Sequence, residues 1–239
     1  MKFSVALFFA GLFGAFGAIF ILISFGTDYW LLARETCKPD SQLNKTEDLN
    51  QPEDQGNFSI FYHEGFFWRC SFKGREENDL ILKFFFTNQP QSKMCEQAYL
   101  SPFPVSEQTH NATTYESAII YRGFWSVFVL LGVAAVILGG FIIICGAPFT
   151  NSCLYKAGGG LFLTAGFFAL LATVLFVIWL ELMNVVDLYK EYRRSHCLFF
   201  QLDITYGLSF MFAPVGVFFC FLSGMLFLLI GRALKQHNC

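Results

Sequence analysis

Histidine is a common acid–base group and metal ligand near neutral pH, and this chain has four: His63, His110, His196 and His237. They are far apart in the sequence, and only His63-Glu64 begins a pattern that a metal could use. A zinc protease would need HExxH, a serine hydrolase GxSxG, and a nucleotide site a glycine-rich loop. None of these motifs occurs in the sequence. We therefore predict no enzymatic activity, no catalytic residue, no cofactor and no metal site.

Cysteine and asparagine offer a different chemistry. The eight cysteines could form disulfides on the oxidising side of a membrane or remain thiols in the cytosol. Three asparagines stand in N-glycosylation acceptor sequences: Asn44-Lys45-Thr46, Asn57-Phe58-Ser59 and Asn111-Ala112-Thr113. Which cysteines can pair therefore depends on which parts of the chain lie outside the cell.

Four long stretches contain no charged residue: Phe3–Phe25, Gly123–Cys145, Gly158–Leu180 and Gly207–Ile230. As a helix, each would rise about 35 Å, enough to cross a hydrocarbon core of about 30 Å. We predict spans at 1–25, 123–145, 158–180 and 207–230, joined by 26–122, 146–157 and 181–206 and followed by a tail at 231–239. A cleaved signal peptide is the alternative for the first stretch, but its apolar run exceeds the roughly 7 to 15 residues of such a signal.

Composition agrees with a membrane protein, because 55% of the residues are hydrophobic and only 14% are charged. The formal net charge is -2 and the basic residues are scattered, which argues against a nucleic-acid partner. Since the spans contain no charge, an ion-coupled transporter is also disfavoured. The lipid bilayer is the first partner that the sequence predicts.

Small residues recur at four-residue spacing in the first and fourth spans. This pattern lets helices approach closely and predicts packing within the chain's own bundle. Docking to another protein, including self-association, is the alternative. The residues are Ala6, Ala10, Gly14 and Ala18, and Gly216, Cys220 and Gly224.

The glycosylation sequences decide which side is outside. All three fall in 26–122, so we place this loop outside the cell and both termini in the cytosol. Cys37, Cys70, Cys95 and Cys197 then share the oxidising side, where they allow three pairings. We favour Cys70 with Cys95 and Cys37 with Cys197, and leave open that Cys37 or Cys197 is unpaired. Cys145, Cys153 and Cys239 would be cytosolic thiols, and Cys220 a small packing residue.

The long outer loop changes character along its length. Residues 34–56 are polar and acidic and are expected to form a mobile insertion. From Phe58 to Phe72 apolar side chains fall on even positions, which predicts one half-buried strand. A turn at 74–79 and a second strand over Leu80–Phe86 would complete a small extracellular antiparallel sheet resting on the helix ends.

These residues also carry a resemblance. A set of residues resembles the motif of the claudin and peripheral myelin protein superfamily: Trp30, Gly65-Phe66-Phe67-Trp68, Cys70, Cys95 and Arg122. We expect Arg122 to lie at the mouth of the second span, near water. The resemblance implies the claudin-like fold, in which we expect Trp30 and Trp68 to hold the sheet onto the bundle. The chain departs from ordinary claudins in the wide spacing of Cys70 and Cys95, in the added Cys37, and in a C-terminus that lacks the hydrophobic residue captured by PDZ domains.

Over nearly its full length the chain resembles one muscle member of that superfamily. This resemblance implies a non-enzymatic plasma-membrane protein that associates with beta-1 integrin, reduces its engagement with laminin, and restrains myoblast differentiation, fusion and muscle regeneration. Two alternatives stay open: a claudin-like adhesion or paracellular junction protein, and an auxiliary subunit of an ion channel. The expected contact surface is the exposed edge of the sheet together with the acidic insertion.

Overall fold

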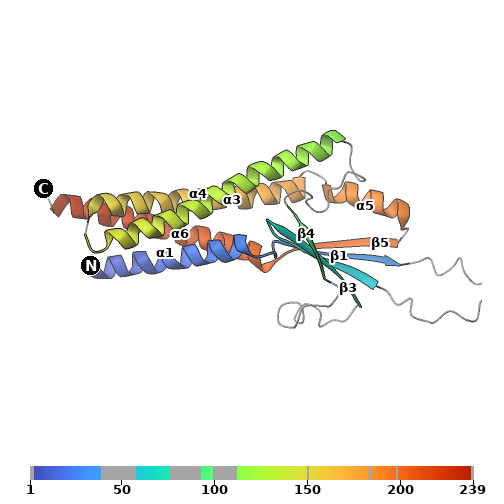
Figure 1. The fold of residues 1–239 in the computed structure, drawn as a ribbon, viewed down its shortest axis with the longest axis horizontal. Helices are drawn as coiled ribbons and strands as arrows, with labels where there is room; N and C mark the ends of the chain where they lie inside the picture. Colours follow the sequence, from blue (N-terminus) through green and yellow to red (C-terminus); the bar gives the residue numbers. More distant parts are fainter. Residues whose placement is uncertain are drawn as a thin grey trace, which may run out of the picture. The chain divides into compact units, whose positions relative to one another are not determined.

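The computed structural model describes residues 3–38, 58–75, 93–98, 112–149, 151–182, 185–197 and 199–237. The chain forms two compact units (Figure 1). A helix unit comprises Met1–Thr27, Ile120–Leu182 and Leu208–Cys239, and a sheet unit comprises Asp28–Ile119 and Met183–Gly207. Asn44, Asn57, Asn111, Cys239 and the predicted strand Leu80–Phe86 lie outside the described residues.

Four long helices supply the helix unit: α1 (Phe3–Gly26), α3 (Ala112–Gly146), α4 (Ser152–Leu182) and α6 (Leu208–His237). Each contains a stretch long and apolar enough to cross a membrane, beginning at Ser4, Ile119, Ser152 and Leu208. Many of their large apolar side chains are exposed, among them Phe8, Phe124, Phe141 and Phe218. A surface of this kind is typical of a helix bundle that faces lipid. The protein is therefore a multi-pass membrane protein with four spans.

Close contacts between α1, α4 and α6 depend on small residues. A Cβ on Gly14 would lie 2.8 Å from Ser223 Oγ, and one on Gly216 would lie 2.8 Å from Ile21 Cγ1. Between α4 and α6, a Cβ on Gly224 would lie 2.8 Å from the carbonyl oxygen of Gly159. The small-residue spacing is thus used for packing inside the bundle, as predicted. Ser223 Oγ adds a hydrogen bond of 2.9 Å to the carbonyl oxygen of Ala10.

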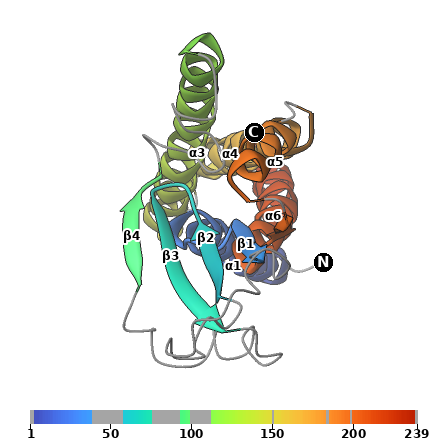
Figure 2. The ribbon, with the colours of Figure 1, turned by 90° about the vertical axis from the view of Figure 1, so that its right-hand side faces the viewer.

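The sheet unit is built on five antiparallel strands in the order β4-β3-β2-β1-β5. Figure 2 shows β4, β3, β2 and β1 in this order. The strands are β1 (Leu31–Lys38), β2 (Phe58–Glu64), β3 (Trp68–Arg75), β4 (Met94–Gln97) and β5 (Phe199–Tyr206). β5 comes from the connection between the third and fourth spans and pairs with β1 along its whole length. The fold class predicted from the sequence, four spans with a small antiparallel sheet, is correct.

The prediction of one strand over Phe58–Phe72 was wrong. The chain turns at Gly65–Phe67, where Gly65 N donates to the Trp68 carbonyl at 2.9 Å, and β2 and β3 form a hairpin. Phe61 lies opposite Phe72, and their rings stack at 5.4 Å. Because an even number of residues separates the opposite positions Glu64 and Arg69, one face of the hairpin holds odd positions of β2 and even positions of β3, which a single even-numbered pattern could not reveal.

Two further predictions, the mobile insertion from Arg34 and the placement of Arg122 near water, also differ from the structure. Arg34–Lys38 belong to β1 and not to a mobile insertion, because this segment hydrogen-bonds to strands on both sides. The predicted loop 181–206 contains a helix, α5 (Val185–His196), and β5. Helix α3 begins at Ala112, so Arg122 lies well inside a helix, and its side chain is buried instead of standing near water.

Candidate functional site

The motif residues of the sheet unit gather where β2 turns into β3. Trp30 is buried, and its ring meets the Phe66 ring in a T-shaped arrangement with the centroids 4.6 Å apart. Its backbone N donates to the Glu64 carbonyl, and its carbonyl accepts from Gly207 N, each at 3.0 Å. A side chain at Gly207 would collide with the carbonyl oxygen of Tyr29, so this contact requires glycine. Trp30 therefore joins the start of β1 to the ends of β2 and β5.

Two of the motif residues lie elsewhere. Trp68 is 47% exposed and so is not part of that core. Arg122 belongs to the helix unit, where its guanidinium lies 4.6 Å above the Trp125 ring. The motif therefore marks residues in both units, and within the sheet unit Trp68 stands apart from the core that Trp30 and Phe66 form.

Two disulfides cross-link the sheet unit. One joins Cys70 on β3 to Cys95 on β4, and the other joins Cys37 on β1 to Cys197 at the end of α5. These are the two pairings favoured from the sequence. Among the described residues, Cys145, Cys153 and Cys220 are free thiols, and Cys220 is buried as expected. The Cys37–Cys197 bond makes α5 and β5 part of the sheet unit.

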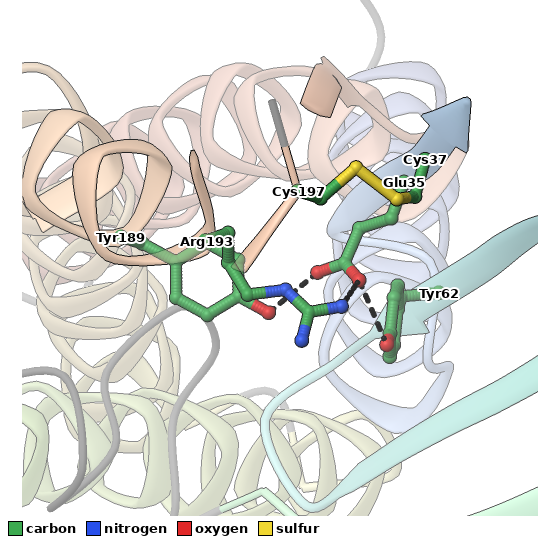
Figure 3. A network of polar contacts seen from close by, with 6 residues as sticks. All are labelled: Glu35, Cys37, Tyr62, Tyr189, Arg193 and Cys197. Atoms are coloured by element: carbon green, nitrogen blue, oxygen red, sulfur yellow. Dashed lines mark hydrogen bonds and ion pairs between the residues drawn. A yellow bond between two sulfur atoms is a disulfide. The ribbon is translucent and has the colours of Figure 1, made fainter. Parts of the chain in front are cut away.

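A buried carboxylate, Glu35, lies beside this second disulfide (Figure 3). Tyr189 and Arg193 reach it from α5, and Tyr62 from β2. Tyr189 Oη donates to Glu35 Oε1 at 2.5 Å, and Arg193 Nη2 and Tyr62 Oη donate to Oε2 at 3.1 and 3.3 Å. The Glu35 side chain is 2% exposed, whereas that of Arg193 is 38% exposed. We call these four residues the Glu35 cluster.

The electrostatics of the Glu35 cluster favour a neutral Tyr62. Burial and the neighbouring Glu35 carboxylate raise the pKa of Tyr62 to about 12. Arg193 also lies over the Phe200 ring at 5.4 Å, so its charge is shared between a carboxylate and an aromatic face. This arrangement suits the positioning of α5 on the sheet. It supports a structural role.

Sequence reasoning missed the Glu35 cluster. The signal was present in the segment Leu31–Lys38, where Leu31, Ala33 and Glu35 alternate and so share one face. Two apolar residues on that face imply that the third is also buried, and a buried acid needs a partner. Two of the partners, Tyr189 and Arg193, lie more than 150 positions away, and the third, Tyr62, lies 27 positions away.

His63 is buried, and its ring stacks on Tyr29 at 4.7 Å. Its Nδ1 lies 3.1 Å from the Asp28 carbonyl oxygen, and burial lowers the pKa of the imidazole to about 4. Glu64 follows His63 in the same strand and therefore faces the other side of the sheet. The pair His63-Glu64 cannot bind one metal ion together.

The exposed edge of the sheet is formed by β4, which pairs on one side only among the described strands. All four of its side chains are exposed. Large apolar side chains stand on β4, at the start of β3 and on the turn before β3: Met94 is 67%, Trp68 47% and Phe67 42% exposed. We call Phe67, Trp68 and Met94 the β4 edge. Exposed apolar groups on a rigid strand are typical of a protein contact surface.

Comparison with known proteins agrees with this architecture. The family profile described as PMP-22/EMP/MP20/Claudin tight junction matches residues 15–229. The chain is 56% identical to transmembrane protein 182 of Danio rerio, 50% to that of Gallus gallus and 47% to that of Homo sapiens, each over the full length of both chains. On the matched profile, the four spans and the antiparallel sheet, the chain belongs to the PMP-22/EMP/MP20/claudin family.

Proposed function

We propose that this chain is a non-enzymatic regulator in the plasma membrane, which acts by binding another surface receptor through its sheet unit. Beta-1 integrin is the proposed receptor, and reduced engagement with laminin and restrained myoblast differentiation and fusion are the proposed consequences. The similarity to transmembrane protein 182 over the full chain supports this proposal. So does the absence from the sequence of the catalytic motifs sought above.

The orientation that this function requires is also part of the proposal. The sheet unit would face the outside and both termini the cytosol. Both disulfides lie in the sheet unit, which suits an oxidising compartment, and all three glycosylation sequences fall between the first two spans. The free thiols Cys145 and Cys153 flank the turn between α3 and α4, which suits the reducing side.

The β4 edge is the observation that carries the proposed contact. It presents Met94 on β4, which a disulfide fixes to β3, so little conformational entropy is lost when a partner binds; Trp68 begins β3 and Phe67 lies on the turn before it. Arg69 and Glu96 form an ion pair of 2.9 Å beside it, which gives the apolar residues a polar border. The opposite edge, β5, also carries an exposed apolar residue, Phe199, and so provides a matched control.

Co-purification from muscle cells in mild detergent tests this function. Wild-type chain is expected to recover beta-1 integrin, and Met94→Asp is expected to reduce recovery by about tenfold or more, as for a residue central to an interface. Phe199→Asp changes an equally apolar position on the other edge and should leave recovery unchanged. All variants are compared at equal cell-surface amounts. No integrin recovered with wild type, or equal recovery with Met94→Asp, would contradict the proposal.

A junctional role is a second candidate, favoured by the family description, which names tight junctions. It predicts that expression in cells without junctions produces strands at cell contacts and changes electrical resistance across the layer. Uniform surface staining with unchanged resistance would remove this candidate. An auxiliary role on an ion channel would instead produce a gating shift on co-expression.

A further inference from the structure

We propose that a membrane sterol binds along the contact between the C-terminal half of α1 and the N-terminal half of α6, with its hydroxyl on Thr27. The two helices lie side by side (Figure 1), and a Cβ on Gly17 would lie 2.8 Å from Cys220 Sγ. Because the helices approach so closely, side chains that flank the contact form one surface. We call the following six residues the α1–α6 seam: Phe16, Phe20, Phe212, Phe219, Thr27 and Ser209.

The four rings of the α1–α6 seam form a continuous aromatic row. The Phe219 ring contacts those of Phe16 and Phe20, with the centroids 5.7 and 6.1 Å apart, and Phe20 contacts Phe212 at 5.7 Å. Phe16 is 40% exposed, and the other three rings are half-buried. The row therefore presents aromatic surface to the bilayer, and a flat apolar ligand can cover several rings at once.

Two hydroxyl groups stand at one end of this row. Thr27 lies seven positions after Phe20, and Ser209 lies three before Phe212, so each hydroxyl is on the face of its helix that carries the rings. Thr27 Oγ1 and Ser209 Oγ are 2.6 Å apart. From Phe16 to Thr27 the helix rises about 16 Å, which is roughly one leaflet of a hydrocarbon core about 30 Å thick. A sterol occupies one leaflet in the same way, with its hydroxyl at the polar end.

The hydrogen bonds of the two hydroxyls leave an acceptor for a ligand. Thr27 Oγ1 donates its proton to the Ile23 carbonyl at 2.7 Å, so Ser209 Oγ is the donor in the contact with Thr27. A hydroxyl has one proton and two lone pairs, and Thr27 Oγ1 therefore keeps one lone pair for a further donor. Ser209 is 2% exposed, whereas Thr27 is half-buried, so Thr27 is the group that a ligand can reach.

This acceptor selects the class of lipid. A sterol hydroxyl can donate a hydrogen bond, whereas phosphatidylcholine carries only ester and phosphate oxygens, which accept. The aromatic row favours the same class, because fused rings lose less conformational entropy on binding than a flexible acyl chain does. The donor, the flat shape and the length together favour a sterol over the surrounding phospholipid.

Photolabelling of the purified full-length chain in phosphatidylcholine nanodiscs tests the proposal. The probe is cholesterol with a photoreactive diazirine on its ring system, and peptide mass spectrometry locates the labels. They should fall in residues 16–27 and 209–219, and unlabelled cholesterol should displace the probe. Epicholesterol has its hydroxyl on the opposite side of the ring, and should compete about three- to tenfold less well, as for the loss of one hydrogen bond.

Substitutions at Thr27 separate the hydroxyl from packing. Thr27→Val removes the acceptor at nearly constant volume and should weaken probe binding by about three- to tenfold, whereas Thr27→Ser should retain it. Thr164→Val on α4 is the matched control, because Thr164 Oγ1 also donates to a carbonyl four residues earlier, that of Gly160, at 2.9 Å. This control should bind the probe like the wild type. Melting in detergent checks that each variant folds.

Four outcomes would overturn the proposal. Cholesterol fails to displace the probe, the displaceable labels lie outside the two segments, or Thr27→Val binds the probe as tightly as the wild type. Equal losses with Thr27→Val and Thr27→Ser would also contradict it, because the hydroxyl would then not be the group that is recognised.

Discussion

At the scale of single residues, Glu35 is a buried acid on β1 that side chains from β2 and α5 contact. Three donors from two different elements share its two oxygens. Removing the charge leaves Arg193 without its carboxylate, although partial exposure lets water replace some of the interaction. The loss of unfolding free energy should therefore be larger than for a broken surface ion pair and smaller than for a broken, fully buried ion pair.

We predict that Glu35→Gln lowers the free energy of unfolding by about 1 to 3 kcal/mol. The matched control is Arg34→Ala on the same strand, which breaks the exposed Arg34–Asp203 pair and should cost less than about 1 kcal/mol. Melting of the purified protein in detergent, with disulfides intact, measures both variants. Equal effects of the two substitutions would show that the Glu35 cluster has no special role.

The raised pKa of Tyr62 predicts how the stability of the sheet unit changes at alkaline pH. Its folded pKa of about 12 lies above the ordinary value of 10.0, so the folded state holds the phenol proton more tightly than the unfolded state. This contribution is present below pH 10 and is lost as the pH rises through 12. Allowing for the partial exposure of the ring, we expect it to amount to about 1 kcal/mol.

The measurement is the difference in melting temperature between wild type and Tyr62→Phe at several pH values. Both proteins carry the other tyrosines and lysines that titrate in this range, so the difference isolates Tyr62. The difference should change between pH 10 and 12 and stay constant between pH 7 and 9. A constant difference throughout would contradict the raised pKa.

At the scale of elements, α5 depends on its covalent link. None of its described side chains is fully buried, and Tyr189 and Arg193 contact the sheet at Glu35 and Phe200. A helix of 12 residues is marginal by itself in water. The Cys37–Cys197 bond therefore supplies much of what keeps α5 in place.

Replacing both Cys37 and Cys197 by serine should expose α5 to proteases. Tryptic cleavage after Lys190, Arg193 or Arg194 is expected to become several-fold faster, because local opening of α5 becomes easier. Cleavage after Arg69 and Lys73 in β3 should not change. If α5 remains as resistant as in the wild type, its noncovalent contacts are sufficient and the disulfide is not needed to hold it.

The elements also show how far the sequence could predict the fold. Absence of charge locates the spans, since the bilayer penalises every charged side chain. It does not locate helix ends outside the bilayer, so the start of α3 at Ala112 was missed among polar residues such as Thr113 and Glu116. Strand periodicity likewise found the apolar positions of β2 and β3 but could not show the turn at Gly65. Alternation in β1 indicated a buried acid at Glu35, but the sequence could not show its partners Tyr189 and Arg193, which lie more than 150 positions away.

At the scale of the whole molecule, the bundle depends on close helix contacts. Gly216→Val should disrupt the contact between α1 and α6, because its Cβ would approach Ile21 N to 3.1 Å as well as the Ile21 side chain. We expect a loss of about 1 to 3 kcal/mol and reduced delivery to the cell surface. Gly140→Val adds the same side chain where a Cβ meets no atom within 4 Å, and should be tolerated. Equal surface amounts of the two variants would contradict this packing.

The placement of the sheet unit outside the cell is the claim on which the proposed receptor contact depends. Intact muscle cells treated with a membrane-impermeant amine reagent, followed by peptide mass spectrometry, test it directly. Lys73 on β3 and Lys190 on α5 should be modified, whereas Lys156 on α4 should react only after the cells are permeabilised. Labelling of Lys156 in intact cells, with Lys73 and Lys190 protected, would contradict the account.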